Sequence, residues 1–411
     1  MNFILKINGS DSPKAAYVGW TPVKCTLSIE GNIADKPMKV VITVGHDGRK
    51  GRLSLYDGNK TSSSPIDKIE HDFQLQQELT FYVAGKFPNA SVAEKDTFIQ
   101  IESAGGEVPA LTQKLMVRIR KNANGLDPQE IENFLRAFVQ LNNLPPKESY
   151  SDNGYVAKPS QLLHEIVLMH TLDALFEIHR RTSFHPWHRA FLLHLERELQ
   201  AVDPSVTVPY WKFDEAADRV FTSAFIGITK KSLNPNAGST DTLRPTFDRT
   251  NPMYSYSDHT IWGGLTRAYA VSNPATGKPR PGIVEQDKIL NGPDLFLSWS
   301  HFEETNSHNQ GHLSFTGHIY NVGKDPVDPL FFMMHSNVDR LWALWQEKYK
   351  RFNNTEEAVY PFQDKYNGKR GKDWADANPG KFQPNSNFYS VDNTDIGNHA
   401  DDSLWPWDLD H

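Results

Sequence analysis

The sequence predicts an α+β multidomain protein, in which an N-terminal antiparallel β-sandwich is followed by a mainly α domain built on a four-helix core. Three observations support this fold class. Residues 1 to about 121 alternate apolar and polar side chains with the period of a strand, whereas apolar side chains from about residue 127 onward recur with the period of a helix. Residues 122–130 between them contain a helix-start signature. Beyond that signature, eleven of the chain's 16 histidines fall in two short windows.

The N-terminal part reads as a series of short strands. Runs rich in Val, Ile, Phe and Thr are bounded by Gly, Asp and Asn turns; they cover residues 38–48, 51–58, 78–87, 96–103 and 114–121. Such spacing is typical of an antiparallel sandwich. Cys25 lies in another alternating segment and is the only cysteine, which excludes an intramolecular disulfide and a thiolate metal site. His46 and His71 are interpreted as structural residues, and residues 1–121 as a domain of unknown role.

The domain boundary is expected at the helix start. Asp127 is placed as N-cap, Pro128 at the first helical position and Glu130 at the third. We therefore expect a second domain over residues 122–350, in which 221–295 form long loops with short helical pieces. Residues 351–411 are expected to be a C-terminal extension that packs on or near this domain.

The two histidine windows predict a metal centre. Six histidines lie within residues 162–200 and five within 301–335. His308 and His312 are four residues apart, which stacks their imidazoles on one helix face. His335 belongs to a second helix, whose core spacing continues through Val338 and Leu341 to Trp342 and Trp345. A single histidine is more often a hydrogen-bonded core or surface residue, but two groups that can each supply three ligands favour metal binding.

The ligand type narrows the choice of metal. Imidazoles without thiolates suit copper, zinc, iron or nickel. Di-iron and di-zinc sites normally add bridging carboxylates, and Glu165, Asp173 and Glu177 show no such paired arrangement. An all-histidine site for two ions therefore favours copper.

Charge and hydropathy exclude other classes of function. The net charge is −7 with both signs interspersed, which argues against nucleic-acid and anionic-membrane partners. No apolar run reaches membrane-spanning length. The N-terminus lacks a secretory signal, so a cytoplasmic location is expected, although a mature secreted chain with an added Met has the same appearance.

At the two histidine windows the sequence resembles a known family. Residues 184–189, Phe-His-Pro-Trp-His-Arg, with Pro-Tyr-Trp at 209–211, resemble the first copper motif of tyrosinases, polyphenol oxidases and molluscan haemocyanins. Residues 308–312, together with 328–346, resemble the second motif. The resemblance covers roughly residues 127–350.

The resemblance implies two copper ions and six ligands. The first ion is assigned to His188, His179 and a third histidine, which is His170 or, as the alternative, His164; the second is assigned to His308, His312 and His335. Arg189, Glu196 and Asp339 are implied as ion partners around the ligands.

The chain departs from the family pattern at a few positions. Met334 replaces a histidine that is not a ligand in the family, and Cys25 lies too far away to form the thioether found in many eukaryotic members. The remaining histidines of the two windows are not expected to be ligands; they are His185, which stands where the family usually has Leu, and His194, His301 and His318.

The implied function is a copper-dependent oxidase that uses O2 as co-substrate to hydroxylate small monophenols and oxidise o-diphenols to o-quinones. The alternatives are an o-aminophenol or catechol oxidase without monophenolase activity, and a haemocyanin-like O2-binding protein. Glu304 and Asn309 stand where the family holds a water that takes the phenol proton, and they are the candidate catalytic residues. The alternative for Glu304 is a solvated surface carboxylate like the neighbouring Glu303.

The C-terminal tail presents aromatic residues on a polar background. Leu404, Trp405 and Trp407 are expected either to cover the copper pocket, as such segments sometimes do in the family, or to pack against the flank of the domain. The physiological phenol and the oligomeric state are left open.

Overall fold

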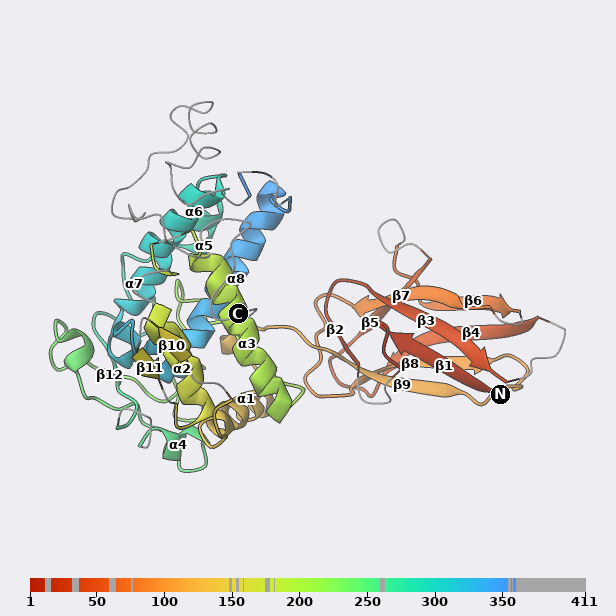
Figure 1. Cartoon of the computed structure of the whole chain (residues 1–411), viewed down its shortest axis with the longest axis horizontal. Coiled ribbons are helices and arrows are strands. Elements are labelled where there is room, and N and C mark those ends of the chain that lie inside the picture. The colour runs from red at the N-terminus through yellow and green to blue at the C-terminus, as the bar shows by residue number, and fades with distance from the viewer. Residues whose placement is uncertain are drawn as a thin grey trace. The chain divides into compact units, whose positions relative to one another are not determined.

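The computed structural model describes residues 1–11, 16–31, 37–58, 64–74, 77–147, 150–152, 155–157, 159–173, 178–180, 182–258, 263–353, 356 and 358–359. Its contacts divide the chain into two compact units (Figure 1). The first unit holds Met1–Ile119, Asp127–Glu130 and Asp203–Thr207. The second holds Arg120–Leu126, Ile131–Val202 and the chain from Val208 onward.

The described residues of the first unit form β-strands. These are β1 (Asn2–Ile7), β2 (Ala16–Val18), β3 (Val23–Glu30), β4 (Met38–His46), β5 (Leu53–Asp57), β6 (Lys68–Phe73), β7 (Leu79–Gly85), β8 (Thr97–Ser103) and β9 (Leu111–Val117). One sheet has the order β1-β3-β7-β5 and the other the order β2-β9-β8-β4-β6. Apolar side chains from both sheets, including Leu27 and Phe81 of one and Ile42 and Ile101 of the other, belong to one buried core cluster. The alternation read in the sequence thus divides each strand into a core face and a solvated face.

The expectation of purely antiparallel pairing is wrong at one edge. Strand β2 pairs parallel with β9, with Val18 opposite Val117, while the other pairings in both sheets are antiparallel. A parallel pair needs a long connection between its strands, and here nearly the whole unit lies between β2 and β9. The short edge strand lacks a sequence pattern of its own because it has only three residues.

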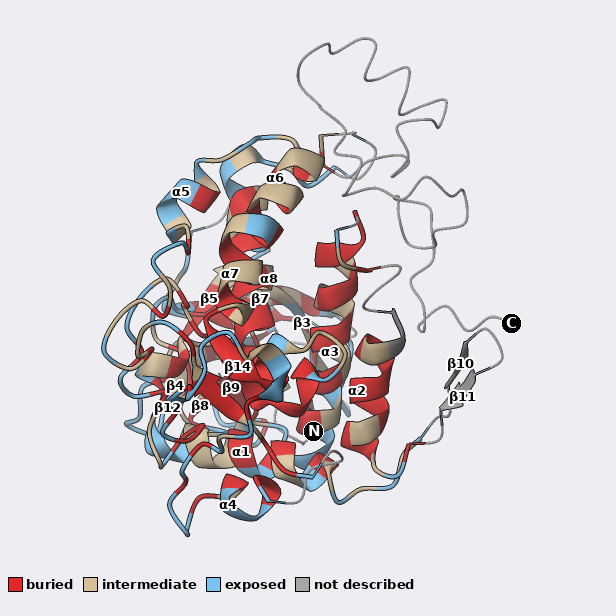
Figure 2. Cartoon of the chain, turned by 90° about the vertical axis from the view of Figure 1, so that its left-hand side faces the viewer, coloured by how far each residue is buried: buried red, intermediate tan, exposed pale blue. Residues whose placement is uncertain are grey.

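The second unit is mainly helical. Its elements are η1 (Ala123–Gly125), α1 (Pro128–Leu141), β10 (Tyr150–Asp152), β11 (Tyr155–Ala157), α2 (Leu162–Asp173), α3 (Phe184–Val202), β12 (Lys230–Lys231), η3 (Gly238–Thr240), α4 (Met253–Tyr256), β13 (Arg267–Tyr269), α5 (Gln286–Leu290), α6 (Phe296–Glu303), η4 (Glu304–His308), α7 (Asn309–His312), β14 (Phe315–Gly317), η5 (His318–Tyr320), η6 (Asp325–Val327) and α8 (Pro329–Tyr349). Helices α2 and α3 are buried over much of their length (Figure 2).

Helix α1 begins at the residues that the sequence indicates. The Asp127 carboxylate accepts from the Gln129 N–H at 3.0 Å, and the Asp127 N–H donates to the Glu130 carboxylate at 3.1 Å. These two bonds form a capping box, which satisfies backbone donors that a helix start leaves open. A short capped start followed by buried Phe134 and Phe138 accounts for the change of period in the sequence.

Helix α8 is fixed at its start by a buried ion pair. Asp328 caps the helix by accepting from the Leu330 N–H at 3.0 Å, and it also accepts from Arg267 Nη1 at 2.6 Å. Both side chains of this pair are fully buried, and Arg267 donates further to the Ile226 carbonyl. Removing either partner would leave an uncompensated buried charge, so the pair specifies where the helix that holds His335 begins.

Two further expectations concern the C-terminal tail and membrane-spanning helices. Leu404, Trp405 and Trp407 of the C-terminal extension lie outside the described residues. Within the described part of the chain, no helix combines the length and the apolar character that crossing a membrane requires.

Candidate metal centre

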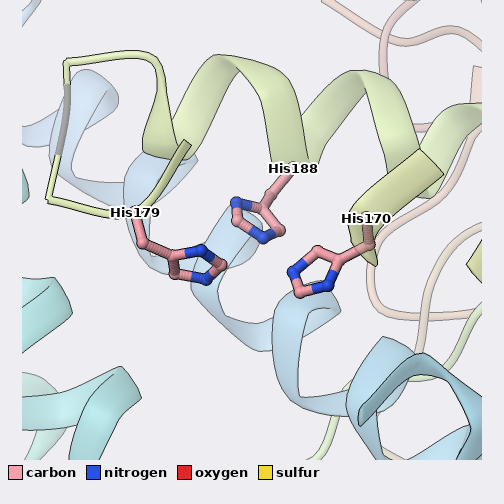
Figure 3. Close-up of side chains that lie close together, drawn as sticks. All are labelled: His170, His179 and His188. Carbon is pink, nitrogen blue, oxygen red and sulfur yellow. The ribbon is translucent and has the colours of Figure 1, made fainter. Parts of the chain in front are cut away.

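Three histidines from consecutive elements of the second unit form a first triad. His170 lies on α2, His179 lies in the turn that follows it, and His188 lies on α3. One ring nitrogen from each lies within 4.8 Å of the others, and Figure 3 shows the three rings turned toward one point. His164 is not in this group, because its Nδ1 accepts from the Ser160 N–H at 3.1 Å.

A second triad joins His308, His312 and His335. His308 Nε2 lies 3.0 Å from His312 Nε2 and 3.1 Å from His335 Nε2. Nitrogens bound at about 2.0–2.1 Å to one tetrahedral ion lie about 3.3 Å apart, so the observed spacing matches ligands of a single ion. His312 and His335 thus both approach His308, although His312 lies on α7 and His335 on α8.

The second triad depends on an irregular helix. His308 and His312 do not lie on one regular α-helix, because residues Glu304–His308 form a π-helical turn that leads into α7. Such turns insert an extra residue and are frequent at functional sites. Gly311 lets α7 approach α8 closely, since a Cβ there would lie 2.9 Å from the Met334 sulfur.

The two triads are neighbours. The rings of His188 and His335 stack with centroids 4.1 Å apart and an interplanar angle of 12°. His179 and His308 also face each other, with ring centroids 6.0 Å apart. The arrangement therefore suits two ions side by side.

Most of the imidazoles have an acceptor beside Nδ1, and this leaves Nε2 for an ion. A neutral imidazole has one N–H and one lone pair, so a partner that accepts from Nδ1 fixes the tautomer in which Nε2 binds metal. The contacts are His188 with the Phe184 carbonyl at 2.7 Å, His308 with Asn309 Oδ1 at 3.0 Å and His312 with the Ile319 carbonyl at 2.6 Å. His170 Nδ1 lies 3.3 Å from Asp325 Oδ1, an ion-pair distance without a hydrogen bond. The buried Nε2 of His188 has no hydrogen-bond partner among the described residues.

Burial also keeps these histidines neutral. It lowers the pKa of His170, His188, His308 and His335 well below the ordinary value, and neighbouring histidines lower these pKa values further. The pKa of the partly buried His312 falls to about 4, again mainly through desolvation. Neutral imidazole is the form that binds a metal ion, so the residues present fit a pair of copper ions.

Glu304 lies at the start of the π-helical turn and is buried. Its side chain is 1% exposed, and Oε1 accepts from the Arg180 N–H at 2.8 Å. Burial raises the pKa of Glu304 to about 8, and the hydrogen bond from Arg180 opposes this rise. Arg180 has a φ of 59°, a left-handed conformation that is uncommon for residues other than glycine. The alternative of a solvated surface carboxylate is wrong, because the turn faces the protein interior.

Asn309 contacts a histidine directly. Because its Oδ1 faces His308 Nδ1 at 3.0 Å, its amide N–H groups are the part left for a water or substrate. Its first role in the structure is therefore to orient His308.

Glu303 is also buried, contrary to expectation. Its Oε2 lies 3.2 Å from His185 Nε2, and His185 Nδ1 lies 2.9 Å from Ser300 Oγ. Burial raises the pKa of Glu303 well above the usual range, and the charge of Glu304 raises it further. His185 thus has partners other than the triads. His194, His301 and His318 also lie outside both triads.

Ion pairs connect α3 and α8 beside the triads. Asp339 Oδ2 accepts from Arg120 Nη1 at 2.8 Å, and Asp339 Oδ1 pairs with Arg189. Arg120 also donates to both carboxylate oxygens of Glu196, at 3.1 Å each. Arg189, Glu196 and Asp339 are therefore ion partners as expected, and Arg120 is an additional member that no local pattern indicated.

Sequence reasoning missed three further residues of the site. Asp325 contacts a histidine of each triad, Arg180 donates its N–H to Glu304, and Glu303 pairs with His185. Only Asp325 had a usable signal, since its Asp-Pro dipeptide precedes the Asp-Pro that starts α8 by three residues.

Comparison with known proteins finds similar sequences and structures. Residues 159–348 match the sequence model of the common central domain of tyrosinase. A tyrosinase of Streptomyces glaucescens is 30% identical over 292 residues, which cover 67% of this chain and 98% of the relative. Hemocyanin 2 of Megathura crenulata is 28% identical over 257 residues, covering 59% of this chain and 7% of that protein. Among solved structures, a polyphenol oxidase mutant from Thermothelomyces thermophila superposes with a TM-score of 0.45 at 18% identity, covering 59% of this chain and 73% of that one.

Proposed function

The chain belongs to the tyrosinase family and is an oxidoreductase of the polyphenol oxidase type. From this premise we propose that it uses O2 to hydroxylate monophenols and to oxidise o-diphenols to o-quinones. The observation that supports this most is the pair of adjacent histidine triads with their Nε2 atoms converging. A single triad would bind one metal ion, whereas two neighbouring triads suit the two-electron chemistry of O2.

The proposed ligands are the members of the two triads. His170, His179 and His188 hold one copper ion, and His308, His312 and His335 hold the other. When bound, the copper pair supplies the electrons for O2 and the oxidant for the phenol ring. The protein supplies the fixed tautomers, the neutral charge of the imidazoles and an apolar surround that includes Phe184 and Phe331.

Glu304 is the proposed base for monophenols. A phenol hydroxyl has an unperturbed pKa of about 10, so little phenolate exists at neutral pH without a base. Burial raises the pKa of Glu304 to about 8, close to neutral pH, and a proton-transfer group is most effective when its pKa lies near the operating pH. Its Oε1 is held by Arg180, and its buried Oε2 has no hydrogen-bond partner among the described residues. Glu304 therefore has an oxygen to accept a proton, directly or through a water that Asn309 orients.

Two other activities are alternatives to monophenol hydroxylation. A catechol or o-aminophenol oxidase without monophenolase activity needs no base for a phenol, so the buried Glu304 favours hydroxylation over this alternative. A haemocyanin-like O2-binding protein would share the copper ligands and show no turnover.

The architecture proposed from the sequence accompanies this function. We infer that residues 1–121 are a β-sandwich domain, that 122–350 are a mainly α copper domain with a four-helix core, and that 351–411 are an extension that packs on or near this domain. The partner is a small phenol, with no nucleic acid.

A colour assay separates these candidates. Copper-loaded protein is incubated in air with tyrosine, catechol, caffeate and o-aminophenol in turn, and quinone absorbance is followed. The proposal expects turnover of tyrosine as well as of catechol. Turnover of catechol alone would support the oxidase without monophenolase activity, and turnover of none would support the O2-binding protein.

A further inference from the structure

A buried carboxylate lies between the two histidine triads. Asp325 is 1% exposed, and its Oδ1 is 3.3 Å from His170 Nδ1 while its Oδ2 is 3.7 Å from His312 Nδ1. His170 belongs to the first triad and His312 to the second. One side chain thus contacts a proposed ligand of each metal ion.

The contact with His170 has a chemical consequence. An ion bound at Nε2 leaves the single proton of the neutral imidazole on Nδ1, and this N–H needs an acceptor in a buried site. Asp325 Oδ1 lies 3.3 Å from His170 Nδ1, within ion-pair range, and neither atom has a hydrogen-bond partner among the described residues. This oxygen is therefore placed to take the Nδ1 proton of a metal-bound His170, and without the carboxylate the ring would lose it.

The contact with His312 is of a different kind. His312 Nδ1 already has the Ile319 carbonyl at 2.6 Å, so Asp325 Oδ2 at 3.7 Å adds an electrostatic contact and not a second hydrogen bond. A negative charge beside a ligating imidazole raises its basicity, which strengthens its bond to a cation.

The backbone holds Asp325 in place. Its N–H donates to the Asn321 carbonyl at 2.8 Å, and its carbonyl accepts from the Asp328 N–H at 3.0 Å. Burying a carboxylate is costly unless it is paired, yet the groups in ion-pair range of Asp325 among the described residues are these two imidazoles, which burial keeps neutral. Cations bound by the two imidazoles would compensate the buried carboxylate.

We propose that Asp325 is a positioning residue shared by both copper ions, which orients His170 and increases the basicity of His312. This inference rests on the proposed copper site. Loss of the carboxylate then weakens copper binding at both triads.

The test measures copper affinity, not turnover. Metal-free protein competes for Cu(I) with a chromogenic chelator, and Asp325→Asn is compared with the wild type. To separate the sites, the same change is made in His335→Ala, which retains the first triad, and in His188→Ala, which retains the second. The matched control is Asp241→Asn, a buried carboxylate of the same unit that accepts from Ser232 and from the Leu243 N–H.

The expected result is a loss of affinity of about 10–100-fold at each site, with the control within about threefold of the wild type. The metal-free Asp325→Asn protein should unfold at the wild-type temperature or above it, because a buried ionisable carboxyl without a positive partner is removed, while its gain in melting temperature on adding copper shrinks. If the asparagine variant does not fold, Asp325→Ser replaces it.

Unchanged affinity at both sites, or a loss confined to one, would overturn the inference. If unchanged affinity were accompanied by a drop in the melting temperature of the metal-free protein, Asp325 would support only the fold. If the wild type itself bound no copper, the proposed function would fail first and Asp325 would lose its role with it.

Discussion

The backbone N–H of Arg180 donates a 2.8 Å hydrogen bond to Oε1 of Glu304. Arg180 follows His179 of the first triad, and Glu304 begins the π-helical turn that ends at His308 of the second. The bond therefore connects the segments that deliver a histidine to each triad. It also fixes one oxygen of the Glu304 carboxyl, whose pKa burial raises to about 8.

Replacing Glu304 by Gln tests its role as a base. Monophenol turnover should fall by about 10²–10⁴, the usual contribution of a positioned base, while catechol oxidation stays within about threefold. The control is Glu303→Gln, a neighbouring buried carboxyl that contacts His185, and it should affect both substrates equally. Steady-state rates with tyrosine and catechol decide the matter, and equal losses for Glu304→Gln would assign it a structural role.

The raised pKa of Glu304 predicts a pH dependence of stability in the metal-free protein. The folded pKa of about 8 exceeds the unfolded value of 4.5, so the unfolded chain releases its proton first as pH rises. This carboxyl therefore stabilises the fold below about pH 4.5 and loses that contribution as pH rises through 8, by about 5 kcal/mol in the limit. Denaturant titrations should show that the free energy of unfolding of the wild type, relative to that of Glu304→Gln, is lower at pH 8.5 than at pH 5. A constant difference between the two proteins would contradict the shifted pKa.

His185→Leu separates a buried ion partner from a metal ligand. The variant should still bind both copper ions, because His185 faces Glu303 and Ser300 and lies outside the triads. It should lose about 1–3 kcal/mol of stability, since Glu303 Oε2 is left buried without its hydrogen-bond partner. The double variant with Glu303→Gln should regain part of that loss. A drop in copper content would instead make His185 a ligand.

The choice between His170 and His164 is tested by copper content. His170→Ala should reduce the content from about two ions per chain to about one, because three nitrogens hold each ion. His164→Ala should keep both ions, since His164 lies outside both triads and its Nδ1 accepts a hydrogen bond from the Ser160 N–H. Elemental analysis of the two variants after loading gives the answer, and the reverse pattern would show that the first triad is assigned wrongly.

The sequence indicated those parts of the structure that have a local signature. Asp127 and Glu130 form the expected capping box, and the buried face of α8 at Val338, Leu341 and Trp345 follows the expected period. These features depend on neighbours within a few residues. The grouping of His308 with His312 was also visible, although the π-helical turn before them was not, because such a turn has no sequence pattern.

Features that depend on contacts between residues far apart in the sequence could not be predicted from local patterns. Arg120 and Asp339 are 219 residues apart in sequence and form an ion pair, and Arg267 meets Asp328 across 61 residues. The burial of Glu303 and Glu304 also arises from the tertiary fold, because two adjacent glutamates ordinarily suggest a solvated surface. The parallel pairing of β2 has the same origin.

The most direct test of the account follows phenol oxidation as copper is added. Metal-free protein is loaded in steps, copper per chain is measured by elemental analysis, and o-quinone formation from catechol is recorded at each step. The account predicts that the rate reaches its plateau at about two coppers per chain and stays near zero in His188→Ala and His335→Ala, which retain about one. A plateau at one copper per chain, full activity in either variant, or two bound coppers without quinone would contradict it.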